Sequence, residues 1–333
     1  MATQVFRSVC LLILANSPFG AAVAQTSADW PHFGGSAGGG QYSALDQINA
    51  SNVSRLEVAW THHSGDKAWL QATPIHANNR LYYCTPMNRV IALDPVSGQE
   101  RWRFDPHTGD GGEGLIDQPR QAVRCRSVAY WEAAEPRPGV PCERRVFKGD
   151  INGNVYAIDA DTGRSCSDFG AGNGHPGYAS HWDYEGNGPG PRHTTSGPIV
   201  IDDLVVAAVG VEDSPVDASD GFVRAFDVRS GELRWEFNPI PPDHVHDTGA
   251  ANVWSTLSAD LDRGLVFLPT TSPSSDFYGG TRKFSIPYAT ATVALSARTG
   301  EPAWHFQVVH HDVYDYDLPG HPLLVTIQKD GKP

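Results

Sequence analysis

The sequence predicts an all-β fold built from repeated four-stranded units, which is the make-up of propeller blades. Three observations support this prediction. A motif of the form Ala-x-Asp/Ser-x-x-Ser/Thr-Gly-x-x-x-Trp recurs along the chain, strand-like apolar runs precede the copies, and 34 Gly and 25 Pro favour many turns. The full copies are Ala92–Trp102, Ala225–Trp235 and Ala294–Trp304, and a fourth, Ala157–Gly163, has Ser167 where tryptophan would fall.

Each copy predicts a strand, a tight turn and a returning strand. The Ala-x-Asp segment continues an apolar run, and the following glycine supplies the positive φ that the turn requires. The tryptophan then returns on the next strand and packs against a neighbouring unit. Alternating segments such as Arg80–Cys84 and Gly264–Leu268 supply further strands. Trp60 has no turn of its own before it, so we expect its segment to complete a last blade.

The first 24 residues predict a secretory signal peptide. Arg7 precedes the short apolar run Val9–Ala15, and Ala22-Val23-Ala24 is a small-x-small cleavage site. The run is too short to span a bilayer, and no later stretch is long enough. We therefore expect residues 25–333 to form the mature propeller domain, without a transmembrane segment, in the periplasm.

Charge and cysteine content restrict the partners and the compartment. A formal net charge of -13 argues against nucleic acid as a partner. Removing the leader leaves Cys84, Cys125, Cys142 and Cys166, which allow three disulfide pairings in an oxidising compartment. We favour Cys125–Cys142, because these two cysteines flank a polar, proline-rich loop.

The chain resembles the PQQ-dependent (pyrroloquinoline quinone) quinoprotein dehydrogenases. The repeats carry part of the resemblance, and Asp29-Trp30-Pro31, Cys125-Arg126-Ser127-Val128 and His310–Pro319 carry the rest. These segments are similar to those of the subfamily of glucose, quinate/shikimate and polyol dehydrogenases that pass electrons to ubiquinone. The resemblance implies an eight-bladed β-propeller of which this chain supplies about four blades, an incomplete ring that corresponds to an N-terminal half.

The resemblance also implies a reaction and a metal. An alcohol, polyol or sugar-type substrate is oxidised by hydride transfer to PQQ, beside a Ca2+ ion held by oxygen ligands. Asp315 matches the catalytic base and also faces the metal. Asp213 and Ser274 match further metal ligands, with Glu212 as the alternative to Asp213.

Four further residues match cofactor contacts of the family. Arg126 and Thr195 match residues that bind PQQ carboxylates, Trp254 matches the tryptophan on which the cofactor ring stacks, and Gln71 stands where relatives often have a glutamate. Asp312 and Asp317 are expected to form turns or support the site, and His310 and His311 to be structural or part of the pocket wall.

Two departures from the family pattern keep other interpretations open. Ala122 replaces a histidine that is usual in glucose-type relatives, which argues against glucose as the substrate. The basic residue that relatives place against the quinone, and a second tryptophan over the cofactor, have no counterpart in this sequence. The alternatives are a non-catalytic propeller scaffold of the outer-membrane assembly type and an inactive truncated fragment.

Overall fold

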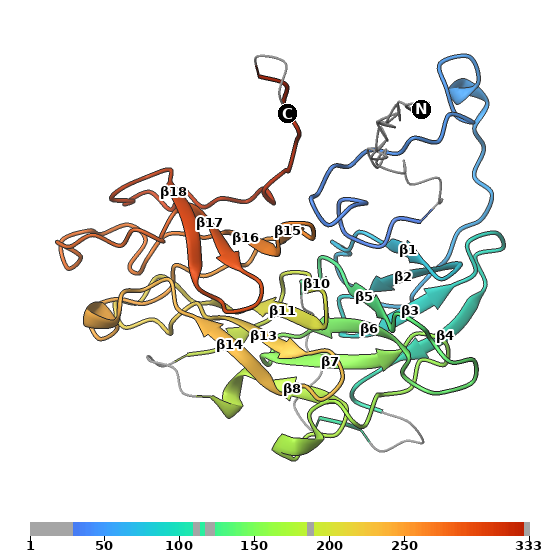
Figure 1. The fold of residues 1–333 in the computed structure, drawn as a ribbon, viewed down its shortest axis with the longest axis horizontal. Coiled ribbons are helices and arrows are strands. Elements are labelled where there is room, and N and C mark those ends of the chain that lie inside the picture. Colours follow the sequence, from blue (N-terminus) through green and yellow to red (C-terminus); the bar gives the residue numbers. More distant parts are fainter. Residues whose placement is uncertain (1–28, 109–113, 117–123, 185–189, 330–333) are drawn as a thin grey trace, which may run out of the picture.

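Four antiparallel four-stranded sheets dominate the structure, a computed structural model that describes residues 29–108, 114–116, 124–184 and 190–329. In each sheet the strands pair in the order in which they occur along the chain. Figure 1 shows the sheets following one another around an open arc, from β1 to β18. The all-β prediction is confirmed for this part of the chain. The ring of eight blades is not tested by it.

The strands of the sheets are short, as expected for blades. The first two sheets contain β1 (Ile75–Ala77), β2 (Arg80–Cys84), β3 (Val90–Leu93) and β4 (Glu100–Phe104), then β5 (Ala129–Glu132), β6 (Arg144–Gly149), β7 (Asn154–Asp159) and β8 (Tyr178–Ser180). The last two contain β10 (Ile199–Ile201), β11 (Leu204–Ala208), β13 (Val223–Asp227) and β14 (Leu233–Phe237), then β15 (Ser258–Asp260), β16 (Leu265–Pro269), β17 (Ala291–Ser296) and β18 (Pro302–Gln307).

Smaller elements connect the sheets. A two-stranded ladder joins β9 (Arg192–His193) to β12 (Gly210–Val211). The helical elements in the described residues are the 3-10 turns η1 (Val53–Arg55), η2 (Ala171–Asn173), η3 (His181–Asp183) and η4 (Pro242–His244). None of the described helices is long and apolar enough to pass through a bilayer.

The repeated motif forms the turn that the sequence predicts. In the first copy, the Asp94 carboxylate accepts hydrogen bonds from the backbone N–H groups of Val96 and Ser97. Gly98 has a φ of +68° and donates its N–H to the Asp94 carbonyl, at 2.9 Å. Asp159 and Asp227 accept the equivalent bonds in their own copies.

Two of the three motif tryptophans, Trp102 and Trp235, dock on the turn of the next sheet. The Trp102 ring packs on Gly163, where an added Cβ would lie 2.7 Å from the ring, and its Nε1 donates to the Ala160 carbonyl at 3.0 Å. Trp235 does the same at Gly300. Since the glycines leave no room for a side chain, these contacts hold neighbouring sheets together.

Two motif positions differ from this pattern. Trp60 lies outside any described strand, so the strand expected there is not seen, but its ring packs on Gly98 in the docking geometry. In the second sheet, where tryptophan is missing, Phe169 lies against Gly231 instead.

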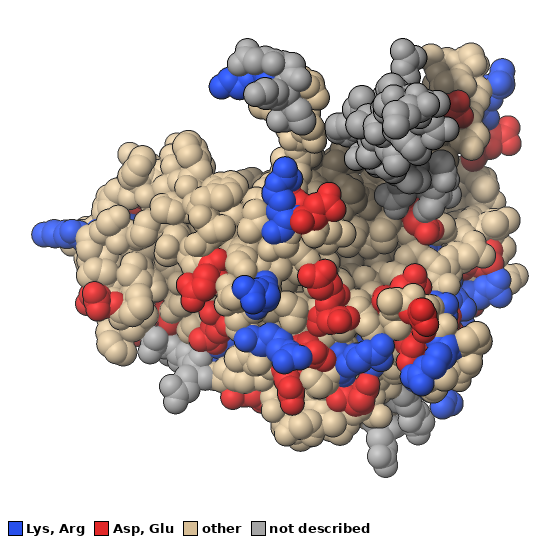
Figure 2. Space-filling view, in the orientation of Figure 1, with Lys and Arg blue, Asp and Glu red and all other residues tan. Residues whose placement is uncertain are grey.

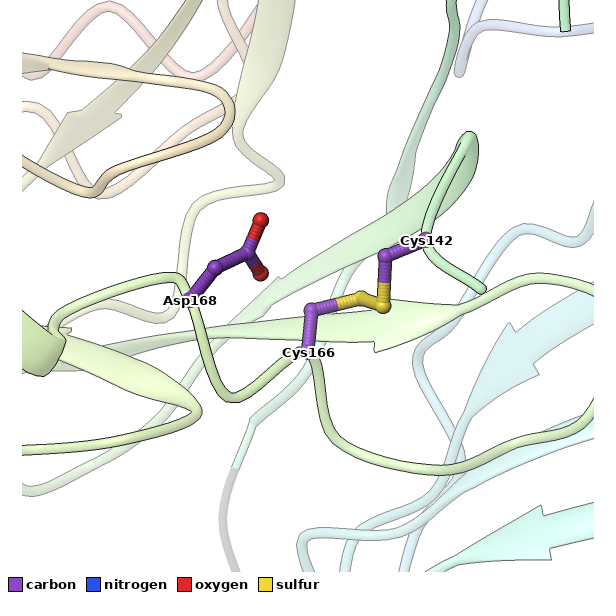
Figure 3. A group of neighbouring side chains, drawn as sticks. All are labelled: Cys142, Cys166 and Asp168. Atoms are coloured by element: carbon purple, nitrogen blue, oxygen red, sulfur yellow. A yellow bond between two sulfur atoms is a disulfide. The ribbon is translucent and has the colours of Figure 1, made fainter. Parts of the chain in front are cut away.

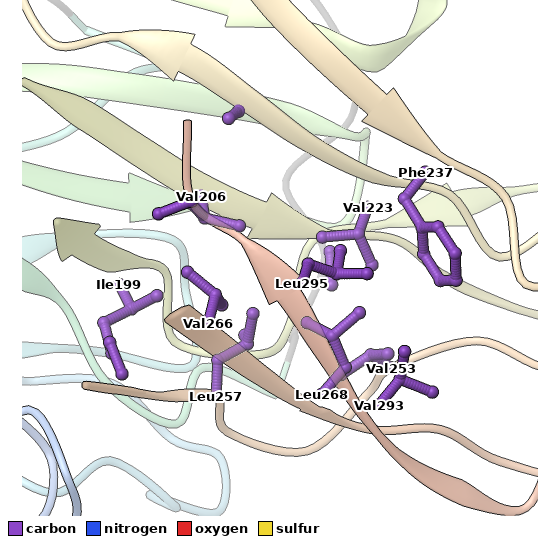
Figure 4. Packing of buried hydrophobic residues seen from close by; sticks show 14 of the residues in the cluster. Ile199, Val206, Val223, Phe237, Val253, Leu257, Val266, Leu268, Val293 and Leu295 are labelled. Carbon is purple, nitrogen blue, oxygen red and sulfur yellow. The ribbon is translucent and has the colours of Figure 1, made fainter. Parts of the chain in front are cut away.

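The largest hydrophobic cluster joins the third and fourth sheets. Figure 4 shows Val206 and Val223 facing Val266 and Leu295, with Ile199 and Leu257 at the same interface. Branched apolar side chains from both sheets therefore fill the space between them, so burial of apolar area supports the arc of sheets.

The expected Cys125–Cys142 disulfide is wrong. Cys84 pairs with Cys125, which links the first two sheets, and Cys142 pairs with Cys166 within the second. Cys125 precedes β5 and Cys142 precedes β6, and these strands are antiparallel, with Glu132 opposite Arg144. The two cysteines therefore lie at opposite ends of one hairpin and cannot reach each other.

The surface in Figure 2 carries acidic and basic side chains close together. Asp161, for example, lies within 2.8 Å of Arg80 and 3.3 Å of Arg144. The predicted signal peptide and Ala122 lie outside the described residues.

Candidate active site

A cavity of about 540 Å³ brings together four of the residues that the sequence analysis selected. Arg126, Thr195, Asp213 and Trp254 all line it. The remaining lining residues are Arg124, Ile151, His193, Gly210, Val211, Asn252 and Asp317. A cavity of this size is suited to a small organic ligand.

A cation lies over an aromatic face inside the cavity. The Arg126 guanidinium carbon is 4.8 Å from the centre of the Trp254 ring, and Arg126 Nη1 donates to the Thr195 hydroxyl at 3.2 Å. Burial and the nearby Arg124 lower the pKa of Arg126 to about 10, so it stays charged at neutral pH. The arrangement offers a flat apolar surface, a positive charge and a hydroxyl to a planar anion.

Local structure holds these side chains in place. The Cys84–Cys125 disulfide fixes the chain directly before Arg126. Thr194 donates its N–H to the Asp150 carbonyl at 2.6 Å, which positions Thr195. Asp213 follows β12, whose Gly210 pairs with His193 of β9. Each functional side chain thus comes from a loop tied to a sheet.

Asp317 supports Trp254 from behind. The indole Nε1 donates to Asp317 Oδ2 at 2.6 Å, and the Ser272 N–H donates to Asp317 Oδ1 at 3.1 Å. Burial raises the pKa of Asp317 to about 6, although both hydrogen bonds oppose the shift. The structure agrees with the supporting role expected for Asp317, and it also places this carboxylate on the cavity wall.

Five aspartates interact with one another on one side of the site: Asp213, Asp276, Asp312, Asp315 and Asp317. Burial, together with the charges of Asp213 and Asp315, raises the pKa of Asp276 to about 7. Partial burial and the charges of Asp213 and Asp312 also raise the pKa of Asp315. Asp276 is only 3% exposed, and its Oδ1 has no hydrogen-bond partner. Such mutual repulsion fits a site that a cation would neutralise.

Asp315 lies at the rim of the site and not in the cavity wall. Its side chain is exposed, and its backbone has a φ of +59°, which is uncommon for a residue other than glycine. Asp312, which is 2% exposed, organises the turn by accepting the N–H groups of Tyr314 and Tyr316. His310 and His311 are exposed.

Two selected residues lie apart from the cavity. Ser274 is fully buried, accepts the Gly249 N–H at 2.8 Å and donates to the Val216 carbonyl at 3.1 Å, so its hydroxyl already has partners. Gln71 is exposed, two residues before Thr73, which donates its N–H to the Arg126 carbonyl. Glu212, the alternative to Asp213, is exposed and does not line the cavity.

Two residues of the site were not predicted from the sequence. Asp276 follows Ser274 in the same loop, so an acidic side chain close to a candidate ligand was a usable signal. Asn252 lines the cavity two residues before Trp254 and is 1% exposed, and no pattern in the sequence distinguishes it.

The tightest group of possible metal ligands lies elsewhere. In the described ranges, three such atoms from Cys142, Cys166 and Asp168 lie within 4.8 Å of one another, whereas the aspartates of the site form no group this tight. Figure 3 shows that the two sulfurs are joined in a disulfide, which leaves no thiolate for a metal.

Fold and site together define a propeller-type domain with a pocket that combines an aromatic face, a guanidinium group and carboxylates. Residues 30–333 match the family described as "PQQ: Glucose/ethanol/alcohol dehydrogenase, beta-propeller domain". The chain belongs to this family, which confirms the resemblance read from the sequence.

Curated relatives include quinoprotein dehydrogenases. The chain is 34% identical to the quinate/shikimate dehydrogenase (quinone) of Acinetobacter baylyi, over 92% of this chain and 41% of that protein. It is 36% identical to the quinoprotein glucose dehydrogenase of Escherichia coli, over 91% of this chain and 40% of that protein. The chain thus spans about two fifths of the length of these relatives.

A solved structure supports the fold. The quinohemoprotein alcohol dehydrogenase from Comamonas testosteroni matches with a TM-score of 0.73 at 23% identity, over 94% of this chain and 46% of that chain. At this identity the match concerns the fold alone.

Proposed function

We propose that this chain forms part of a PQQ-dependent dehydrogenase that oxidises an alcohol, polyol or sugar-type substrate. The observation that carries the proposal is the convergence of Arg126, Thr195, Asp213 and Trp254 on one cavity, with Asp315 beside it. These five residues come from five separate segments outside the strands, so their meeting does not follow from the repeated motif.

The cavity residues fit a planar, anionic quinone. Trp254 would stack on the ring, while Arg126 and Thr195 would bind a carboxylate of the cofactor. When bound, PQQ supplies a carbonyl that accepts a hydride from the substrate. Asp315, at the rim, would accept the hydroxyl proton of the alcohol.

The aspartates fit a divalent cation with oxygen ligands, for which we propose Ca2+. Asp213 and Asp315 would hold the ion, since each raises the pKa of a neighbouring carboxyl group. Ser274 remains a proposed ligand, but its hydroxyl would first have to release Gly249 and Val216.

We also propose a cellular compartment and an electron acceptor for the protein. Two disulfides support an oxidising compartment, which agrees with a periplasmic location after removal of a signal peptide. By analogy with relatives named as quinone-dependent, ubiquinone or another respiratory acceptor would receive the electrons. Because the chain spans about two fifths of the length of these relatives, we also propose that its four sheets form part of an eight-bladed ring. Ala122 still argues against glucose as the substrate.

The test is reconstitution. The purified protein is mixed with PQQ and Ca2+, and oxidation of alcohols, polyols and quinate is followed with an electron-accepting dye. Reduction of the dye that depends on both PQQ and Ca2+ supports the proposal. A folded protein that binds no PQQ would overturn it and favour a non-catalytic scaffold.

A further inference from the structure

Two arginines line the cavity, and neither has an acidic partner among the described residues. Arg124 and Arg126 flank Cys125, and the side-chain hydrogen bonds of Arg126 go to Thr195. Arg80, by contrast, pairs with an acidic side chain at 2.8 Å. In a chain with a formal net charge of -13, two guanidinium groups without a counter-ion in one cavity point to an anionic ligand.

The two guanidinium groups repel each other. Burial lowers the pKa of Arg126, and the positive charge of Arg124 lowers it further. Like charges held close together cost free energy as long as no anion lies near them. Binding of a carboxylate beside them would remove this repulsion and add charge-assisted hydrogen bonds.

The acidic residues of the site do not act as counter-ions for these arginines. Asp317 accepts the indole N–H of Trp254 at 2.6 Å, and Asp213 interacts with Asp276 and Asp315. Within the described part of the chain, none of these carboxylates forms an ion pair with Arg124 or Arg126. The site therefore offers unpaired positive groups for a carboxylate as well as carboxylates for a cation.

The two arginines differ in depth. Arg126 is half-buried, with its guanidinium carbon 4.8 Å from the centre of the Trp254 ring, so a carboxylate of the stacked quinone accounts for it. Arg124 lines the same cavity, but its side chain is exposed. Arg124 thus lies at the opening, where a substrate enters.

We propose that Arg124 binds a carboxylate of the substrate, so that the protein oxidises acidic polyols in preference to neutral ones. Such a molecule would place its carboxylate on Arg124 and a hydroxyl group beside Asp315. The planar guanidinium is suited to bidentate binding of a carboxylate, and its charge would attract an anion into the cavity. This inference depends on the proposed function, because the substrate is oxidised at the same site.

The test replaces Arg124 with glutamine, which keeps a hydrogen-bond donor and removes the charge. Oxidation of two acidic polyols, gluconate and quinate, is compared with oxidation of two neutral ones, sorbitol and inositol. Arg124→Gln is expected to raise the KM for the acids about 10- to 100-fold at unchanged kcat, because a uniform binding contact is lost. The KM for the neutral polyols should stay close to the wild-type value.

Two further measurements separate the substrate from the cofactor and from the fold. PQQ affinity, measured by titration in the presence of Ca2+, and the melting temperature without cofactor should both be unchanged in Arg124→Gln. Arg55 provides the matched control, because it is also exposed but does not line the cavity. Arg55→Gln is expected to leave the KM for both classes of polyol unchanged.

Three results would overturn the inference. The wild-type protein could oxidise neutral polyols and no acid, or Arg124→Gln could raise the KM for the acids no more than for the neutral polyols. Weaker PQQ binding by Arg124→Gln would make Arg124 a contact of the cofactor instead. A wild-type protein that oxidises neither class would refute the proposed function itself.

Discussion

Aspartates at the docking turns and aspartates at the cavity have opposite environments. Hydrogen bonds from Ser97 and Arg101 hold the pKa of Asp94 well below its usual range, whereas burial and neighbouring charges raise the pKa of Asp276 to about 7. In the turns, the aspartate oxygens accept hydrogen bonds from the protein itself. At the cavity, the aspartates repel one another, and Asp276 Oδ1 has no hydrogen-bond partner. The difference separates a scaffold that stabilises the fold from a site built for a ligand.

An aspartate-to-asparagine substitution made once at the cavity and once at a docking turn gives the largest expected difference in oxidation rate. Asp315→Asn removes the proposed base and should lower the rate of dye-linked alcohol oxidation by at least about 100-fold. Asp94→Asn should lower stability but leave the rate of the folded protein unchanged. Initial rates at matched PQQ loading measure both. Equal rates for Asp315→Asn and the wild type would remove Asp315 from the mechanism.

The contribution of a motif tryptophan to the free energy of unfolding should depend on whether its ring packs on the turn of a neighbouring sheet. Trp102 is 8% exposed and bound to Ala160, whereas Trp304 occupies the same motif position and is 47% exposed. Trp102→Ala should cost about 3–5 kcal/mol of unfolding free energy. Trp304→Ala should cost less than about 1 kcal/mol. Urea denaturation measures both, and equal losses would contradict the proposed role of docking.

Removing each disulfide separately distinguishes support of the site from support of the fold. The bridges close loops with sequence separations of 41 and 24 residues, so each double Cys→Ala variant should lose about 3–4 kcal/mol. Loss of Cys84–Cys125 should also weaken PQQ binding, since Arg126 directly follows Cys125. Loss of Cys142–Cys166 should not. Cofactor titration of both variants is the check, and equal weakening would refute the anchoring role.

The raised pKa of Asp276 predicts a pH dependence of the cofactor-free protein. The folded state holds this proton more tightly than the unfolded state, so the stabilisation is present at low pH and is lost as pH rises through about 7. Unfolding free energy should fall by about 2 kcal/mol between pH 5 and pH 8. Asp276→Asn should flatten the curve. An unchanged slope in that variant would place the titration elsewhere.

What the sequence predicted well depends on local chemistry. The turn at Asp94 needs only an acceptor, a hydroxyl residue and a glycine within five positions, so it can be predicted from the sequence. The docking tryptophan stands at a fixed distance from the same motif, so its position could be predicted too. The resemblance selected Arg126 and Trp254, which lie far apart in the chain, and the structure places the guanidinium 4.8 Å from the ring centre.

What the sequence did not predict depends on distant packing. The disulfide pairing follows from which end of the β5–β6 hairpin each cysteine occupies, and loop composition does not encode this. Ser274 accepts a hydrogen bond from Gly249 and donates one to Val216, and only the fold brings these two residues close to Ser274. An asparagine becomes conspicuous only when the structure shows it buried without a partner, as at Asn252.

Anomalous diffraction from crystals grown with PQQ and Ca2+ tests the central claim most directly. The account predicts one cation bound by carboxylate oxygens of Asp213 and Asp315, at roughly 2.3–2.6 Å. It also predicts a flat quinone on the face of Trp254, with one of its carboxylates paired with Arg126. A cation remote from these aspartates, or a quinone bound outside this cavity, would contradict it.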